Sequence, residues 1–72
     1  MTKKFKLKNL DCADCAAKME RKINQMDGVE EARVNFMFSR LTLTAADSVF
    51  DRVSEQVASL IKEIEPDCTM VF

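Results

Sequence analysis

The 72-residue sequence lacks several features that would assign it to a class at once. No apolar run is long enough to cross a bilayer, and the basic start, MTKKFKLKNL, lacks the apolar core of a secretion signal. An excess of positive charge is also absent, because 11 basic and 12 acidic residues leave a formal net charge of −1. We therefore expect a soluble domain in a reducing cytosol, and the overall charge argues against a nucleic acid or an anionic membrane as partner.

Cysteine is scarce and odd in number, and the signatures of catalysis by ATP are missing. Three cysteines in a cytosolic chain do not predict a disulfide framework. No nucleotide-binding loop or phosphorylated-aspartate motif is present, so the domain alone is not predicted to be an enzyme. Its length allows one compact domain, residues 1–72, with a small core. The hydrophobic fraction of 47% excludes a disordered tail.

Alternation of apolar and polar residues predicts four strands, which are separated by helical or turn signals. The predicted strands are Lys3–Leu10, Glu31–Phe36, Arg40–Ala45 and Cys68–Phe72. The apolar face of the second strand is predicted to carry Ala32, Val34 and Phe36. The second and third lie close together in the sequence, so a hairpin joins them, whereas the other connections are long enough to hold a helix.

Two amphipathic helices fill these longer connections. The first begins near Cys15 and ends at Asp27–Gly28, and the second is capped by Asp47 or Ser48 and stopped by Pro66. Their apolar positions are Ala16, Met19, Ile23 and Met26 in the first, and Phe50, Val53, Val57, Leu60, Ile61 and Ile64 in the second. The order β-α-β-β-α-β with two right-handed crossovers predicts a ferredoxin-like α+β fold, in which a four-stranded antiparallel sheet carries both helices on one face.

This topology brings three loops to one end of the sheet. They are the loop Asp11–Asp14, the hairpin at Met37 and Phe38, and the turn Glu63–Asp67. Met37 and Phe38 are unusual for an exposed turn; such residues commonly fold back on the core, and the alternative is that they cover a site or touch a partner domain. Any binding site at this end should draw its side chains from the three loops.

The segment LDCADCAAKME places Cys12 and Cys15 at the mouth of the first helix, where free N–H groups and the helix dipole favour a thiolate. A disulfide, a redox dithiol and a metal site compete as explanations, while simple packing fits poorly beside two aspartates. Asp11 and Asp14 should raise the thiol pKa values, which opposes redox chemistry but becomes an advantage once a cation is bound. We therefore interpret the pair as a metal site, with a redox dithiol as the weaker alternative.

The carboxylates near the pair bear on which metal is bound. Two thiolates alone suit Cu(I), whereas Zn(II), Cd(II) and Pb(II) take more ligands and accept a mixed shell of sulfur and oxygen. Asp11 is the first choice for the third ligand, and Asp14 is interpreted as compensating the helix dipole. Glu63 or Glu65 could add a further carboxylate or bridge a second ion in a homodimer, against the plainer interpretation of a solvated helix end. Strand parity makes Cys68 a packed core thiol.

The segment NLDCADCAAKMERKINQMDGVEEARVNF, followed by SRLTLTA and the closing helix and strand, resembles a heavy-metal-associated domain over the whole chain. Copper-binding members carry Met-Thr before the first cysteine and often Gly followed by Tyr or Phe in the last turn. Here Leu10-Asp11 precedes Cys12 and the turn reads KEIEPD, which resembles the domains of bacterial zinc- and cadmium-transporting P-type ATPases. The resemblance implies that Cys12 and Cys15 are metal ligands, together with Asp11.

The resemblance also implies a function. Such a domain would capture Cd²⁺ or Zn²⁺, or Pb²⁺, at the cytoplasmic face of the cell membrane and pass it to the transmembrane or cytosolic domains of the same efflux pump. The alternative is a free-standing metallochaperone for Cu(I) or Hg(II), and a metal-bridged homodimer stays open. Lysines of the first strand offer a surface for docking by opposite charge. RNA binding is rejected, since the open sheet face carries no aromatic residue among Lys6, Lys8, Arg33, Thr42 and Thr44.

Overall fold

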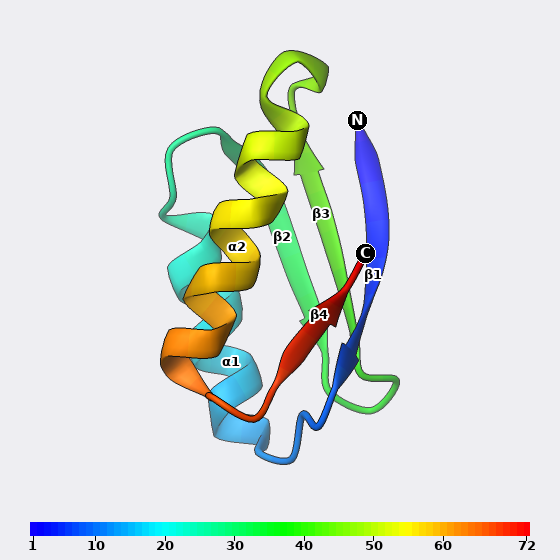
Figure 1. Cartoon of the computed structure of the whole chain (residues 1–72), viewed down its shortest axis with the longest axis vertical. Coiled ribbons are helices and arrows are strands. Elements are labelled where there is room, and N and C mark those ends of the chain that lie inside the picture. The colour runs from blue at the N-terminus through cyan, green and yellow to red at the C-terminus, as the bar shows by residue number, and fades with distance from the viewer.

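A computed structural model describes residues 1–72, and it confirms the ferredoxin-like arrangement (Figure 1). The elements in chain order are β1 (Thr2–Lys8), α1 (Ala13–Asn24), β2 (Val29–Asn35), β3 (Arg40–Ala45), a 3₁₀ turn (Asp47–Val49), α2 (Phe50–Ile64) and β4 (Thr69–Val71). Both helices cover the same face of the sheet, and the opposite face is open (Figure 1). No helix has the length and apolarity that a membrane span requires.

The four strands form one antiparallel sheet in the order β2-β3-β1-β4. β1 is central between β3 and β4, with Phe5 opposite Leu41 and Leu7 opposite Met70. These apolar side chains point toward the helices, so the neighbouring lysines of β1 project from the open face. The register thus fixes one apolar and one charged face for the central strand.

The core lies between the sheet and the two helices, and both apolar stripes predicted from the sequence contribute to it. Its fully buried members include Met19 and Ile23 of α1, and Val53, Val57 and Ile61 of α2. Their spacing of three and four residues places them on one side of each helix. Because α2 is anchored by this stripe along its whole length, the direction of its last turn is set by packing.

The ends of several elements differ from the prediction. β1 stops at Lys8 rather than Leu10 because Asn9 adopts a left-handed backbone with φ of 61°, which breaks the extended chain. β4 is confined to Thr69–Val71. Phe36 was expected on the core face of the second strand, but β2 ends at Asn35 and the side chain of Phe36 is 40% exposed.

The predicted cap of the second helix is wrong. Neither Asp47 nor Ser48 caps α2 with its side chain, because a 3₁₀ turn precedes the helix and α2 itself begins at Phe50. The carboxylate of Asp47 instead lies 3.1 Å from the N-terminal ammonium group of Met1. The expectation that Met37 and Phe38 fold back on the core is also wrong, since their side chains are 83% and 67% exposed.

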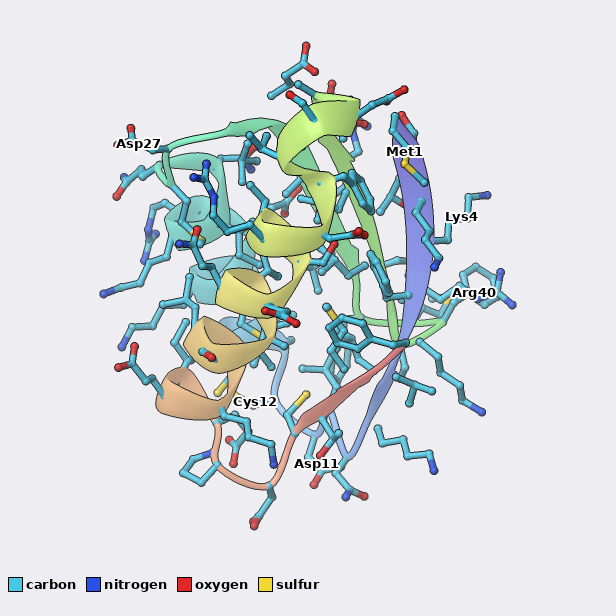
Figure 2. All side chains as sticks on the ribbon, turned by 45° about the horizontal axis from the view of Figure 1, so that its top comes forward. Met1, Lys4, Asp11, Cys12, Asp27 and Arg40 are labelled. Carbon is cyan, nitrogen blue, oxygen red and sulfur yellow. The ribbon has the colours of Figure 1, made fainter.

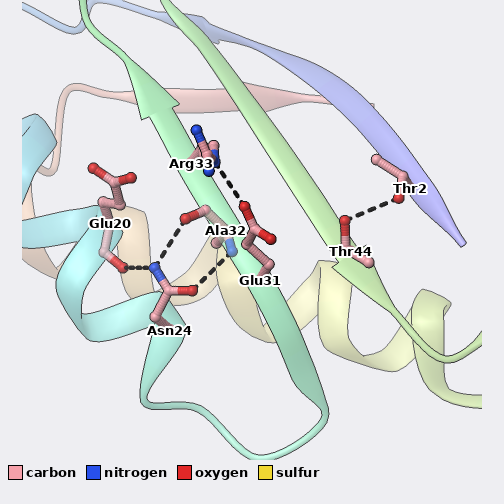
Figure 3. Close-up of polar contacts among 7 residues, drawn as sticks. All are labelled: Thr2, Glu20, Asn24, Glu31, Ala32, Arg33 and Thr44. Carbon is pink, nitrogen blue, oxygen red and sulfur yellow. Dashed lines mark hydrogen bonds and ion pairs between the residues drawn. The ribbon is translucent and has the colours of Figure 1, made fainter.

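One side chain ties the end of α1 to the edge strand β2 (Figure 3). The amide group of Asn24 donates hydrogen bonds to the carbonyl oxygens of Glu20 and Ala32, and its oxygen accepts one from the N–H of Ala32; each is 2.8 Å long. The following loop contains Gly28 with φ of +91°, a conformation that glycine adopts without strain. Together these features close the connection between α1 and β2.

Candidate metal centre

The three predicted loops meet at one end of the molecule, at the bottom of Figure 1. The side-chain amide of Asn9 donates a hydrogen bond of 3.2 Å to the carbonyl oxygen of Asp67, which joins the loop after β1 to the turn before β4. The N–H of Leu7 donates to the carbonyl oxygen of Ser39 at 2.7 Å, which joins β1 to the hairpin. The first bond holds the residue that leads into the cysteine loop beside the turn before β4, and the second places the hairpin at the same end of β1.

Cys12 is the residue that caps α1. Its backbone is extended, with φ of −125° and ψ of 121°, and its Sγ accepts a hydrogen bond of 3.3 Å from the N–H of Cys15. A cysteine sulfur thus takes the place that a serine or aspartate oxygen usually fills. The hydrogen bonds from the thiol and the N–H of Cys15 lower the pKa of Cys12 and outweigh the opposing effects of desolvation and of the negative charge of Asp14.

Cys15 lies in the first turn of α1 and is half-buried. Its Sγ lies 3.7 Å from Oε2 of Glu65 and donates toward that carboxylate. Sharing a hydrogen bond with Cys12 keeps the proton on Cys15 and raises its pKa to about 11, with desolvation and the negative charges of Cys12 and Glu65 acting in the same direction. Of the two thiols, Cys12 therefore ionises more readily than Cys15.

Glu65 reaches the thiols from the other half of the chain. It is the residue at the C-terminal end of α2, where its N–H donates to the carbonyl oxygen of Ile61 at 2.9 Å. Its own carbonyl oxygen accepts a hydrogen bond of 2.9 Å from the N–H of Cys68. With its backbone held at both groups, its half-buried side chain faces Cys15.

The other predicted carboxylates do not contact the thiol pair. Glu63 is exposed and lines an open groove along α2 with Ser59 and Leu60. Asp14 is exposed in the first turn of α1, the position expected for compensating the helix dipole. Asp11 makes no hydrogen bond or ion pair with either thiol, although its charge contributes to raising the pKa of Cys68. Figure 2 shows Asp11 and Cys12 at the same end of the molecule.

Cys68 is fully buried in the hydrophobic core. Desolvation raises the pKa of this thiol, and the charges of Glu65 and Asp11 add to the effect. A buried neutral thiol of this kind behaves as a small apolar side chain. The predicted role of Cys68 as a core residue agrees with its burial.

In the free protein the candidate metal donors contact one another in pairs, but they do not form a complete coordination shell. Cys12 contacts Cys15, and Cys15 contacts Glu65, but no three cysteine, aspartate or glutamate side chains are gathered in the geometry of a bound ion. Sulfur and carboxylate donors that converge on one side suit borderline and soft divalent ions. Binding would require Cys15 to lose its proton and the three side chains to turn toward a common centre.

The helical spacing of the buried residues of α2 distinguishes Glu65 from Glu63, although the sequence-based prediction treated the two as equivalent. Val57, Ile61 and Glu65 are spaced by four residues, so Glu65 continues the buried stripe of α2 and Glu63 does not. The N-cap role of Cys12 was also missed, because cysteine is not among the usual capping residues.

The fold and this thiol pair define a small ferredoxin-like domain with two cysteines at the mouth of its first helix. The chain belongs to the heavy-metal-associated domain family, whose model matches residues 4–67. The resemblance seen in the sequence is thereby confirmed, and the domain is a heavy-metal-binding module.

A relative agrees with this assignment, and two solved structures have the same fold. A "cadmium, zinc and cobalt-transporting ATPase" of Helicobacter pylori is 40% identical over 94% of this chain, and the chain spans only 9% of that relative's length. Among solved structures, a "CopZ metallochaperone" matches with a TM-score of 0.77 and 21% identity, covering 99% of this chain and all of that one. A "putative copper-ion-binding protein" of Bacillus anthracis matches with a TM-score of 0.79 and 15% identity, covering 99% and 94%. The two structures share the fold.

Proposed function

We propose that this chain binds Cd²⁺ or Zn²⁺, with Pb²⁺ as a further candidate, through Cys12, Cys15 and a carboxylate. The carrying observation is the approach of Glu65 Oε2 to within 3.7 Å of Cys15 Sγ. Two thiolates and a carboxylate supply more negative charge than Cu(I) needs, whereas a divalent ion is neutralised by them and accepts the mixed ligands. Asp11, next to Cys12 in the chain, remains a second carboxylate for the shell.

The order of events follows from the unequal thiols. Cys12, whose pKa is lowered, would coordinate the ion first, and Cys15 would coordinate it next with loss of its proton. Both sulfurs are only half-buried, so an incoming ligand from a partner can reach the ion before the old ligands leave. This arrangement allows transfer by exchange of ligands between two sites.

Membership of an ATP-driven efflux pump is the wider part of the proposal. It is supported by the identity to a part of a cadmium-, zinc- and cobalt-transporting ATPase, whose length this chain covers to 9%. In that setting the domain would lie at the cytoplasmic face of the membrane and deliver metal to the transmembrane or cytosolic domains of the same protein. ATP hydrolysis would then be carried out by the other domains. A homodimer bridged by metal would be detected as a doubling of the molecular mass of the domain in solution when Cd²⁺ is added.

Titration with Cd²⁺ tests the binding step directly. Sulfur-to-cadmium absorption should appear with one equivalent of ion in the reduced protein and should be lost in Cys12→Ser/Cys15→Ser. Cys68→Ser is the matched control, since that thiol is buried in the hydrophobic core, and it should retain the absorption if it folds. A reduced wild-type domain that ignores Cd²⁺ and Zn²⁺ but binds Cu(I) would replace this proposal with the copper-carrier alternative. Turnover of a disulfide substrate by the metal-free domain would replace it with the redox alternative.

A further inference from the structure

The open face of the sheet is rich in basic side chains, although the chain as a whole is nearly neutral. Lys4, Lys6 and Lys8 of β1 alternate with the buried Phe5 and Leu7, so all three lysines project from this face. Figure 2 shows the labelled Lys4 and Arg40 on the side of β1 that faces away from α2. The formal net charge of the whole chain is −1. Since this face is basic, the acidic residues that balance it lie mainly on other parts of the surface.

These basic side chains repel one another, and no ion pair within the chain compensates their charge. Lys6 lies directly opposite Arg40 in the antiparallel pair of β1 and β3. Like charges at opposite positions destabilise a sheet. The ion pairs of the chain, Met1 with Asp47 and Arg33 with Glu31, do not include Lys4, Lys6, Lys8 or Arg40.

An apolar prominence adjoins the same basic face. Phe36, Met37 and Phe38 form the hairpin between β2 and β3, with side chains 40%, 83% and 67% exposed. The turn is ordered, because the N–H of Phe38 donates to Oδ1 of Asn35 at 3.1 Å and the N–H of Ser39 donates to the carbonyl oxygen of Phe36 at 3.3 Å. The large apolar side chains are thus held outward.

The lysines and the hairpin are held together. The N–H of Leu7 donates to the carbonyl oxygen of Ser39 at 2.7 Å, which places the lysines on either side of Leu7 beside the turn. Arg40 follows the turn directly. The exposed apolar side chains of the hairpin are therefore adjacent to basic side chains that form no ion pair. We name this surface the hairpin patch; it consists of Phe36, Met37, Phe38, Lys6, Lys8 and Arg40.

We propose that the hairpin patch docks the domain on an anionic lipid bilayer, with Met37 and Phe38 inserted among the headgroups. Apolar side chains that protrude from a positively charged surface gain from both the interface and the surface potential of anionic lipids. A flat acidic protein surface would neutralise the lysines but would not bury a projecting tip. The hairpin lies at the same end as the cysteine loop (Figure 1), so docking would hold the metal site close to the membrane surface.

The absence of tryptophan and tyrosine makes a clean test available. Phe38→Trp introduces a single fluorophore into the tip, and Phe72→Trp is the matched control, because Phe72 is 65% exposed but lies at the C-terminus outside the patch. On addition of phosphatidylcholine vesicles containing phosphatidylglycerol, the emission of Phe38→Trp should shift to the blue and that of Phe72→Trp should not. Vesicles of phosphatidylcholine alone should shift neither.

Sedimentation of the wild-type domain with the same vesicles measures the contributions of the patch. Met37→Ser/Phe38→Ser should weaken binding about tenfold or more, and Lys6→Gln or Arg40→Gln about fivefold each, whereas Lys18→Gln on α1 should leave it unchanged. Salt should release the bound protein. Equal binding of the tip variant, or no binding to anionic vesicles at low salt, would overturn the proposal. Cd²⁺ titration of the same samples shows whether the metal site is intact, so failure at the membrane is separable from failure of metal binding.

Discussion

Replacing Glu65 by glutamine separates two effects of this carboxylate, its proposed role as a metal donor and its influence on the pKa of Cys15. The change removes the negative charge 3.7 Å from Cys15 Sγ and nearly preserves the shape of the side chain. It should weaken Cd²⁺ binding by removing a donor. It should also strengthen binding by lowering the pKa of Cys15, because the Glu65 charge helps to raise that pKa. The net result depends on which effect is larger.

We expect the loss of the donor to be the larger effect. With a pKa of about 11, displacing the Cys15 proton reduces the apparent metal affinity at neutral pH by about four powers of ten. The hydrogen bond with Cys12 and desolvation are the leading causes of the rise above 9.0, so removing Glu65 should restore less than about tenfold of this loss. An interaction with a charged group contributes about 1.5–3 kcal/mol, which corresponds to roughly 10- to 100-fold in affinity. We expect Glu65→Gln to bind Cd²⁺ several-fold to about tenfold more weakly at neutral pH.

The pH dependence distinguishes the two effects. Between the lowered pKa of Cys12 and about pH 11, each bound ion displaces one proton from Cys15, so the apparent affinity should rise about tenfold per pH unit. In Glu65→Gln this rise should end at a lower pH, because Cys15 then ionises more readily. The deficit of the variant should therefore grow as the solution becomes alkaline and proton competition disappears in both proteins.

Competition with a chromophoric chelator over a pH series measures the affinity, and the sulfur-to-cadmium absorption reports the thiolates. Glu63→Gln is the matched control, since Glu63 lies two residues away and lines the outer groove instead of facing Cys15. Asp11→Asn tests the other predicted carboxylate. Affinity and pH slope in Glu65→Gln that equal those of the wild type would refute the reasoning. A loss confined to Asp11→Asn would assign the third donor to Asp11.

Two further predictions concern the stability of the fold. Asn24→Ala removes the two hydrogen bonds to Ala32 that join α1 to β2, together with one to Glu20 within α1, and should lower the free energy of unfolding by about 2 kcal/mol. In urea unfolding the exposed Gln25→Ala should stay within about 0.5 kcal/mol of the wild type, and equal midpoints for the two variants would contradict the stabilising role of Asn24. Gly28→Ala forces a side chain onto a backbone with φ of +91° and places its Cβ 2.8 Å from Cγ2 of Val53, so it should cost about 2 kcal/mol or more. Val53→Ala in the same chain should relieve part of that cost, and strictly additive losses in the double variant would show that the contact with Val53 carries none of it.

The order of elements and the sheet could be predicted from periodicity, whereas the ends of elements could not. The buried residues of α2 recur at three and four positions and those of β1 at every second one, so the faces of both were readable. The stop of β1 depends on the left-handed backbone of Asn9, and the start of α2 on a 3₁₀ turn. Such local choices are decided by tertiary contacts, among them the ion pair that takes Asp47 away from the helix start.

For the candidate site, the sequence predicted the meeting of the loops better than the contacts within it. Topology alone placed the turn before β4 beside the cysteine loop, and the contact of Glu65 with Cys15 agrees with that placement. Adjacency in the chain favoured Asp11, yet its side chain makes no hydrogen bond with either thiol, whereas the thiol of Cys15 donates toward Glu65. Adjacency in sequence fixes the distance between backbones, but it leaves the direction of a side chain to the loop conformation.

The position of Glu65 explains how one fold could serve different ions. Packing of Val57 and Ile61 directs the last turn of α2, and the hydrogen bonds of Glu65 to Ile61 and Cys68 hold its backbone beside the thiol pair. A side chain at this position therefore starts from a backbone that lies next to Cys15, and Glu65 is half-buried rather than part of the core. Under the proposed function, a carboxylate there would add an oxygen donor and negative charge for a divalent ion, whereas a neutral side chain would leave two thiolates, which suffice for a monovalent soft ion. The proposal therefore predicts that Glu65→Gln shifts the relative affinity of the domain from Cd²⁺ toward Cu(I).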